Sequence, residues 1–158
     1  MLKLVVISPL TPLRAGDEFD RDRIPLHLTV LPPIRVDEDD AQAVTSAVVE
    51  LASATAPITV TGTDYADFGP GGDVRVTTVD GSQELRQLHS RLLGSAQQAG
   101  AVPVQPDYNG PGYRPHITHT DDGVVRPGER ILLSTLAIID CTGATRPVAA
   151  TAPLAGSN

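Results

Sequence analysis

The order of the predicted elements indicates an α+β protein with antiparallel strand pairing, and three observations lead to this class. Short apolar runs typical of strands alternate with two amphipathic stretches, in the order strand, strand, helix, hairpin, helix, strand, strand, strand. The connections are short, which favours antiparallel neighbours. One histidine–threonine motif occurs in each half, which indicates a weak internal duplication. We expect residues 1–150 to form a single domain of two related halves, followed by a flexible tail at 151–158.

In the first half, an apolar run rich in Val and Ile predicts a strand, and the polar stretch behind it predicts a surface loop. The strand with the first histidine should end at Pro32-Pro33, because proline has no N–H to give to a sheet ladder. An acidic start and apolar residues at helical spacing predict a helix. Two strand-like runs around a glycine-rich turn predict a hairpin. These elements are expected at 2–7 (strand), 11–23 (loop), 38–55 (helix), and 58–63 and 74–79 (hairpin strands).

In the second half, Asp80-Gly81-Ser82 begins a helix with a stripe of leucines, and Gly100 is the expected stop. The stretch 103–112 is rich in proline and glycine, which predicts an ordered loop before the second histidine strand. Beyond that strand, Ile131–Ile139 is long and apolar enough for one central strand, and 146–150 fits an edge strand.

Composition and charge exclude several classes of partner. The chain has 158 residues, of which 41% are hydrophobic, and a net charge of −7. This charge does not indicate the cationic surface that non-specific binding of duplex DNA requires. A small or terminal phosphate ligand remains compatible. The single Cys141 rules out an internal disulfide and favours a reducing compartment. No apolar run is long enough for a membrane span, and the start lacks the layout of a signal peptide. We therefore expect a cytoplasmic monomer without a membrane partner.

The strongest functional signal is a pair of short motifs, Pro25-Leu26-His27-Leu28-Thr29-Val30 and Pro115-His116-Ile117-Thr118-His119. In a β-strand, residues i and i+2 point to the same face. Each motif therefore presents a histidine and a threonine on one face and an apolar residue toward a core. Two imidazoles and two hydroxyls presented together are the groups needed for acid–base chemistry on a phosphodiester without a metal.

The stretches His27-Leu28-Thr29-Val30-Leu31-Pro32-Pro33 and Arg114-Pro115-His116-Ile117-Thr118 resemble the paired motifs of the two-histidine (2H) phosphoesterases. This family includes the 2′-5′ RNA ligase-like proteins and cyclic phosphodiesterases. Chain length and motif separation are also similar, so the resemblance covers nearly the whole chain. It implies two pseudo-symmetric lobes, each an antiparallel sheet with a packed helix, which share a central cleft. His119 departs from the pattern, because the family usually has an aliphatic residue there.

The resemblance also implies an activity. It implies a metal-independent phosphodiesterase without a cofactor, acting on a 2′,3′-cyclic phosphate, a 2′-5′ linkage or a small cyclic (oligo)nucleotide. His27 and His116 would serve as acid and base in an order that pseudo-symmetry leaves open, and the hydroxyls of Thr29 and Thr118 would hold the phosphate oxygens. Ligation, the reverse reaction, stays open. The alternative is a non-catalytic module that binds an RNA end or a nucleotide in the same cleft.

Other residues near the motifs are candidates for substrate binding. Arg114 shares strand parity with His116, so it either reaches a phosphate or is a solvated arginine. Tyr108 and Tyr113 precede the second motif and have rings suited to stacking on a base. His89 lies beside the apolar stripe of the second helix, where packing is the expected role. His116 and His119 are three residues apart and thus on opposite strand faces, which makes them a poor pair of metal ligands.

Overall fold

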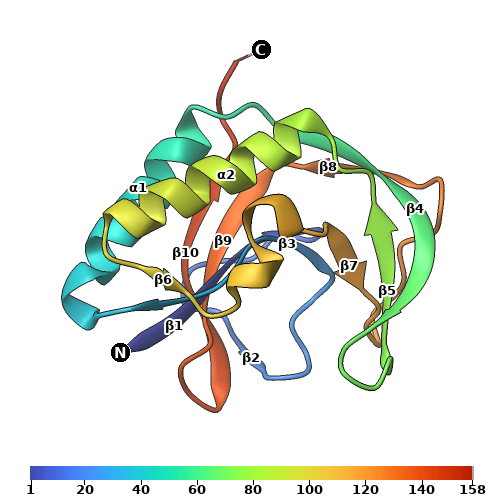
Figure 1. Ribbon diagram of the computed structural model, residues 1–158, viewed down its shortest axis with the longest axis horizontal. Helices are drawn as coiled ribbons and strands as arrows, with labels where there is room; N and C mark the ends of the chain where they lie inside the picture. The colour runs from blue at the N-terminus through green and yellow to red at the C-terminus, as the bar shows by residue number, and fades with distance from the viewer. Residues whose placement is uncertain (158) are drawn as a thin grey trace.

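The computed structural model describes residues 1–157 and shows a curled, mostly antiparallel sheet with two α-helices (Figure 1). This confirms the α+β class. The first half of the chain supplies β1 (Leu2–Pro9), β2 (Glu18–Asp20), β3 (His27–Val36), α1 (Ala41–Ser53), β4 (Ile58–Phe68) and β5 (Val74–Val79). The second half supplies α2 (Gln83–Gln98), β6 (Val102–Pro103), β7 (His116–Thr118), β8 (Arg130–Leu133), β9 (Thr135–Asp140) and β10 (Thr145–Pro153).

The strands of the described residues form one continuous sheet in the order β2-β10-β9-β1-β3-β7-β5-β4-β8, with β6 attached to β3. Two groups of strands meet in its middle. The group β10-β9-β1-β3 belongs to one lobe and the group β7-β5-β4-β8 to the other, and the β3–β7 pairing joins them. Figure 1 shows the second group curving away from the first. The two motif strands are therefore adjacent, at the junction of the lobes.

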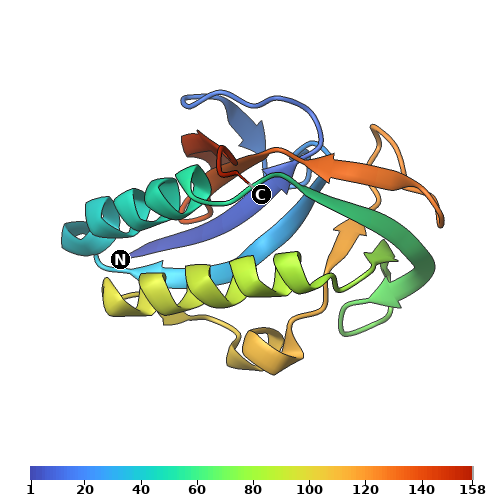
Figure 2. The same cartoon turned by 90° about the horizontal axis from the view of Figure 1, so that it is seen from above.

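The main core lies between the helices and the first lobe. Both helices run side by side over this face (Figure 2), where α1 contacts β9 and β10 and α2 contacts β3. The helical stripes predicted from the sequence point inward, because Val44 and Val48 of α1 are buried, as are Leu85, Leu88 and Leu92 of α2. Burial of such a stripe, rather than intrinsic propensity, is the main stabilisation of helices of this length.

The segment predicted as a surface loop at 11–23 differs from the expectation. It contains the short strand β2, which pairs with β10, and it covers the opposite face of the first lobe. There Leu13, Phe19 and Ile24 pack against a second buried cluster made by alternate residues of β1, β9 and β10. Both faces of β1 and β9 are thus covered, which explains why these strands are continuously apolar.

Strand β3 does not end at Pro32-Pro33, as the sequence predicts, but continues to Val36. Its pairing with β1 shifts there, because Leu4 faces Ile34 while Val6 faces Leu31. The two prolines occupy this bulge, where no ladder partner on β1 needs their missing N–H groups.

The predicted central strand Ile131–Ile139 is two strands, separated at Ser134. The first, β8, pairs with β4 in the second lobe, and the other, β9, pairs with β1 in the first. Strand β10 also runs past the expected start of the tail, to Pro153, and Leu154 is buried in the core. Asn158, the last residue of that expected tail, lies outside the described residues. No helix within 1–157 is both long enough and apolar enough to cross a membrane.

Candidate active site

The pairing of β3 with β7 brings the two motifs together. Leu28 lies opposite Ile117 in an antiparallel register, and both side chains are 0% exposed. The same register places His27 across from Thr118 and Thr29 across from His116. These four half-buried residues therefore share the face opposite the core, as strand parity predicts, and are related by a pseudo-two-fold axis through the Leu28–Ile117 pair.

Both imidazoles are held in the same way. His27 Nδ1 lies 2.8 Å from the carbonyl oxygen of Pro25, and His116 Nδ1 lies 2.7 Å from that of Arg114. A carbonyl can only accept, so each Nδ1 carries a hydrogen and donates it. In the neutral ring, Nε2 then keeps its lone pair and is the atom free to exchange a proton. Each carbonyl belongs to the residue two positions before its histidine, so the support repeats with the motif.

The environment disfavours the protonated form of both rings. Burial lowers the pKa of His27 below its usual value, the hydrogen bond to Pro25 opposes this shift, and the nearby His116 lowers the pKa further. Burial likewise lowers the pKa of His116, opposed by its bond to Arg114 O, and the Arg114 charge adds to the decrease. Because a charge on one ring lowers the pKa of the other, a pair with a single proton is favoured over a doubly protonated pair.

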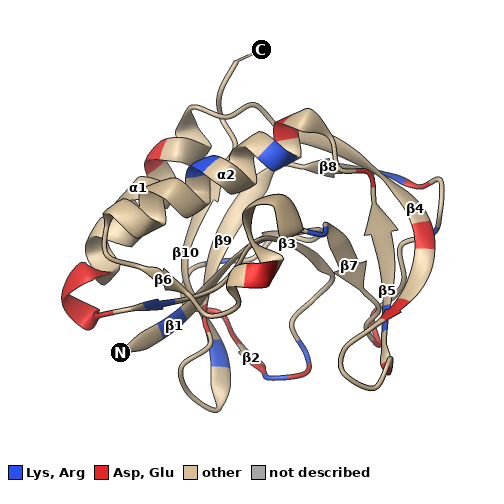
Figure 3. Cartoon of the chain, in the orientation of Figure 1, with Lys and Arg blue, Asp and Glu red and all other residues tan. Residues whose placement is uncertain are grey.

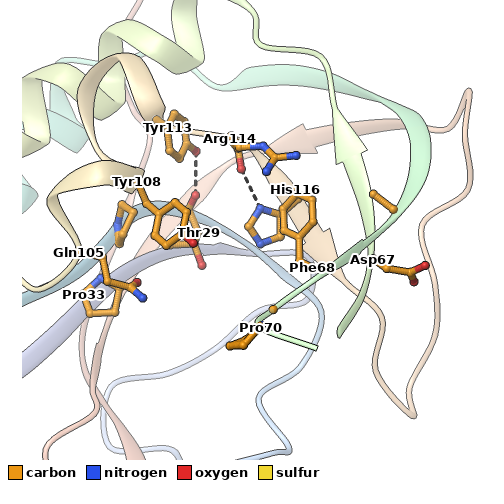
Figure 4. Close-up of a pocket in the computed structure, with 13 residues that line it drawn as sticks. Thr29, Pro33, Asp67, Phe68, Pro70, Gln105, Tyr108, Tyr113, Arg114 and His116 are labelled. Atoms are coloured by element: carbon orange, nitrogen blue, oxygen red, sulfur yellow. Dashed lines mark hydrogen bonds between the residues drawn. The ribbon is translucent and has the colours of Figure 1, made fainter. Parts of the chain in front are cut away.

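A cleft of about 670 Å³ opens beside the motifs (Figure 4). This size is typical of pockets for small ligands. Of the four motif residues, Thr29 and His116 are part of its wall, whereas His27 and Thr118 are not. The remaining wall comes from β3, from the tip of the β4–β5 hairpin and from the segment before β7: Pro32, Pro33, Ala66, Asp67, Phe68, Gly69, Pro70, Gln105, Tyr108, Tyr113 and Arg114.

Arg114 lies exposed at the cleft, as its strand parity suggests. Its guanidinium sits 4.4 Å from the centre of the Phe68 ring, and that ring also packs edgewise on His116 at 4.7 Å. Within residues 1–157 the single ion pair joins Arg75 to Asp67, so no carboxylate neutralises Arg114. A cation left unpaired beside the histidines is suited to an anionic ligand.

Phe68 was not among the residues expected from the sequence. It ends β4 and precedes the turn Gly69-Pro70-Gly71-Gly72, so it lies at the tip of the hairpin beside the second motif. One signal was available, because the chain has only two phenylalanines and this one stands directly before a glycine-rich turn. Its distance from the motif in sequence hid the contact with His116.

The two tyrosines of the preceding loop have different environments. Tyr108 is 53% exposed and lines the cleft, so its ring remains available for a base. Tyr113 is only 4% exposed, and one face of its ring is stacked on His89 with centroids 4.0 Å apart. The expectation that Tyr113 stacks on a substrate base stays a prediction for the other face of its ring, because His89 already covers one face.

The other two histidines lie outside this face. His89 is buried, with its ring nitrogens bonded to the carbonyl of Val30 (2.7 Å) and the N–H of Gly110 (2.9 Å), in keeping with the expected packing role. His119 Nε2 lies 3.0 Å from the hydroxyl of the buried Thr77, on the opposite side of the strand from His116. Within the described part of the chain, no three His, Cys, Asp or Glu side chains are grouped to hold a metal ion.

Basic side chains are scattered singly over several elements (Figure 3). Arg114 is the basic residue of the cleft wall and Asp67 the acidic one, and Asp67 is already paired with Arg75. The electrostatics of the cleft thus favour a ligand with localised negative charge over a long polyanion, which would need a continuous basic surface.

Comparison with known proteins identifies the family. The sequence profile of the 2′-5′ RNA ligase superfamily matches residues 6–126, a segment that includes both motifs and all the residues of the cleft wall. The chain belongs to the 2′-5′ RNA ligase superfamily. The expectation that the chain is a 2H phosphoesterase-like protein is thereby confirmed.

The chain is also similar to individual proteins, to one in sequence and to two in fold. A Bacillus licheniformis protein provisionally named a phosphoesterase is 30% identical over 95 residues, which are 60% of this chain and about half (52%) of that relative. The crystal structure of E. coli LigT has a TM-score of 0.64 and 17% identity, with 97% of each chain covered. The protein TT0787 of Thermus thermophilus has a TM-score of 0.65 and 16% identity over the full length of both chains. At 16–17% identity, the similarity to these two structures shows a shared fold alone.

Proposed function

We propose that this member of the superfamily is a phosphodiesterase that hydrolyses a 2′,3′-cyclic phosphate, a 2′-5′ linkage or a small cyclic (oligo)nucleotide. The observation that carries this proposal is the Leu28–Ile117 register, which sets two His-x-Thr motifs across from one another on one face. Each Nδ1 is engaged by a backbone carbonyl, which leaves two Nε2 atoms for proton exchange. Such a pair supplies both a general base and a general acid.

The proposed mechanism follows from these groups. One neutral imidazole takes a proton from water through Nε2 while the water oxygen forms a bond to phosphorus. The bond from phosphorus to the ribose oxygen breaks, and the second, protonated imidazole gives its proton to that oxygen. The product is a phosphomonoester, and the two histidines have exchanged protonation states, because the first keeps the proton from water and the second has given its proton to the ribose oxygen. Hydroxyls of Thr29 and Thr118 donate to the non-bridging oxygens, where negative charge accumulates in the transition state.

The choice of substrate class rests on the cleft and on its relatives. Arg114 adds a positive charge beside the histidines, and Tyr108 and Phe68 supply aromatic surface on the cleft wall. E. coli LigT has been crystallised with 3′-AMP, with ATP and with NADP+. A nucleotide is the ligand that matches both this chemistry and the ligands of that relative. The negative net charge of −7 favours small or terminal phosphates over duplexes.

The test is a substrate panel with EDTA-treated protein. Nucleoside 2′,3′-cyclic phosphates, 2′-5′-linked dinucleotides, cyclic dinucleotides and 3′-5′-linked controls are incubated with the protein, and products are identified by mass spectrometry. We expect phosphomonoester products from at least one of the first three groups. The same protein carrying both His27→Ala and His116→Ala controls for contaminating activity and should form none. Tight binding without turnover of any compound would instead indicate the non-catalytic nucleotide module.

The pH dependence of the reaction follows from the lowered pKa values. The active pair carries one proton, and both pKa values lie below the ordinary histidine value of 6.5 in the free protein. As pH rises through these values the acid is lost, and as pH falls below them the base becomes protonated. We expect a bell-shaped profile of kcat/KM with its maximum on the acid side of pH 6.5. An optimum in the alkaline range would contradict the proposed acid–base pair.

A further inference from the structure

Tyr113 is a residue of the cleft wall that several neighbours hold in place. Its hydroxyl donates to the backbone carbonyl of Thr29 at 2.7 Å (Figure 4), and its own carbonyl accepts from Arg86 of α2 at 3.2 Å. Burial raises the pKa of its phenol, so the hydroxyl stays protonated and remains a donor. Its side chain therefore ties the segment before β7 to the strand of the first motif.

His89 supports this tyrosine from the side of α2. The two rings are parallel within 4°, and the imidazole is held between Val30 of β3 and Gly110 of the same segment. Nδ1 must donate to the Val30 carbonyl, so Nε2 accepts the Gly110 N–H and the ring is neutral. Both ring nitrogens of His89 are engaged in hydrogen bonds within the protein, and only 1% of its surface is exposed. His89 therefore acts by holding its neighbours in position.

The next residue extends the connection to the second motif. The Arg114 carbonyl accepts a hydrogen bond from His116 Nδ1. Two consecutive residues therefore contact the two motifs, since the Tyr113 side chain holds Thr29 and the Arg114 backbone holds His116. The direct ladder between β3 and β7 is short, because within the described residues it consists of one pair, Leu28 and Ile117. Thr29 is paired with Ile7 of β1 on one edge of β3, and on the β7 side its carbonyl is held by the Tyr113 hydroxyl.

We infer that Tyr113, stacked on a neutral His89, is a positioning residue that fixes the Thr29 end of the first motif against His116. This inference rests on the proposed function, because Thr29 matters to the reaction only if its hydroxyl holds a phosphate oxygen. The effect is one-sided. Thr118, the pseudo-symmetric counterpart of Thr29, has no bond to this tyrosine, so the influence of Tyr113 should reach one threonine and spare the other.

A double-mutant cycle tests this one-sidedness. Tyr113→Phe removes only the hydroxyl and keeps the stacked ring. We expect it to lower kcat about 3- to 10-fold with little change in KM, which corresponds to one neutral hydrogen bond. The loss should persist in a Thr118→Val background and shrink below about 2-fold in a Thr29→Val background. Tyr65→Phe, which removes an exposed hydroxyl from β4, is the matched control and should leave kcat unchanged. Equal losses in both threonine backgrounds would overturn the inference.

A second measurement does not depend on turnover. This measurement is NMR spectroscopy of protein labelled with ¹³C at threonine methyl groups. Tyr113→Phe should shift the methyl signal of Thr29, whereas the methyl signal of Thr118 should have the same position as in the Tyr65→Phe control. The ring of residue 113 is retained, so the shift reports the loss of the Tyr113 hydrogen bond at Thr29. If the wild-type protein turned over no substrate, the proposed function would be wrong. The spectrum would still test whether Tyr113 positions Thr29, because it does not require turnover. An unmoved Thr29 signal would refute that role.

Discussion

Replacing either histidine of the two motifs by alanine is expected to lower kcat about 10²- to 10⁴-fold, the usual contribution of a positioned general acid or base. Both rings present one free Nε2 and both are fixed through Nδ1, so His27→Ala and His116→Ala should be similarly damaging. Because the two act in one proton-transfer cycle, the double variant should lose little more than either single variant. Steady-state kinetics on the substrate found in the panel measures all three.

His119→Ala is the matched control for these variants. It removes an imidazole three residues from His116, on the opposite side of the strand, where the His119 ring contacts Thr77. We expect kcat within about 2-fold of the wild-type value, because this ring lies outside the proposed proton path. Circular dichroism of each variant verifies that the fold is retained. Near-normal turnover by His27→Ala or His116→Ala would remove the basis of the proposed mechanism.

The largest expected effect on stability comes from the pair that joins the lobes. Ile117 is completely buried opposite Leu28, so Ile117→Ala removes side-chain atoms packed at the junction of β3 and β7 and leaves a cavity. Such substitutions cost about 2–5 kcal/mol, a large part of the 5–15 kcal/mol that typically stabilises a domain. Urea denaturation followed by circular dichroism measures this loss in the free energy of unfolding.

Two further substitutions separate packing from other effects. Ile117→Val keeps the branched β-carbon and deletes one methyl group, so its cost should be about 0.5–1.5 kcal/mol. Leu132→Ala on β8 removes a leucine that is 60% exposed and should change the free energy of unfolding by less than about 0.5 kcal/mol. If Ile117→Ala were no more costly than Leu132→Ala, the β3–β7 junction would not be the tightly packed contact that the structure shows.

Local patterns in the sequence were sufficient for most of the elements. The apolar stripes predicted both helices, and Gly100, with a φ of 103°, ends the second as expected because that backbone conformation favours glycine. The alternation in His27-Leu28-Thr29 and His116-Ile117-Thr118 predicted which side chains are buried and which are half-buried. These features depend on the periods of helices and strands, which a short stretch of sequence carries in full.

What only the tertiary structure decided depends on pairing between distant segments. The run 131–139 is apolar throughout, and nothing within it marks Ser134 as the point where the strand changes partners from β4 to β1. The burial of Tyr113 likewise follows from α2, which brings His89 against its ring. Hydrogen bonds and packing between segments far apart in the chain fix register and burial, and local periodicity contains neither. The sequence by itself therefore determined which residues each motif presents, while the fold determined how the motifs face each other and which residues hold them.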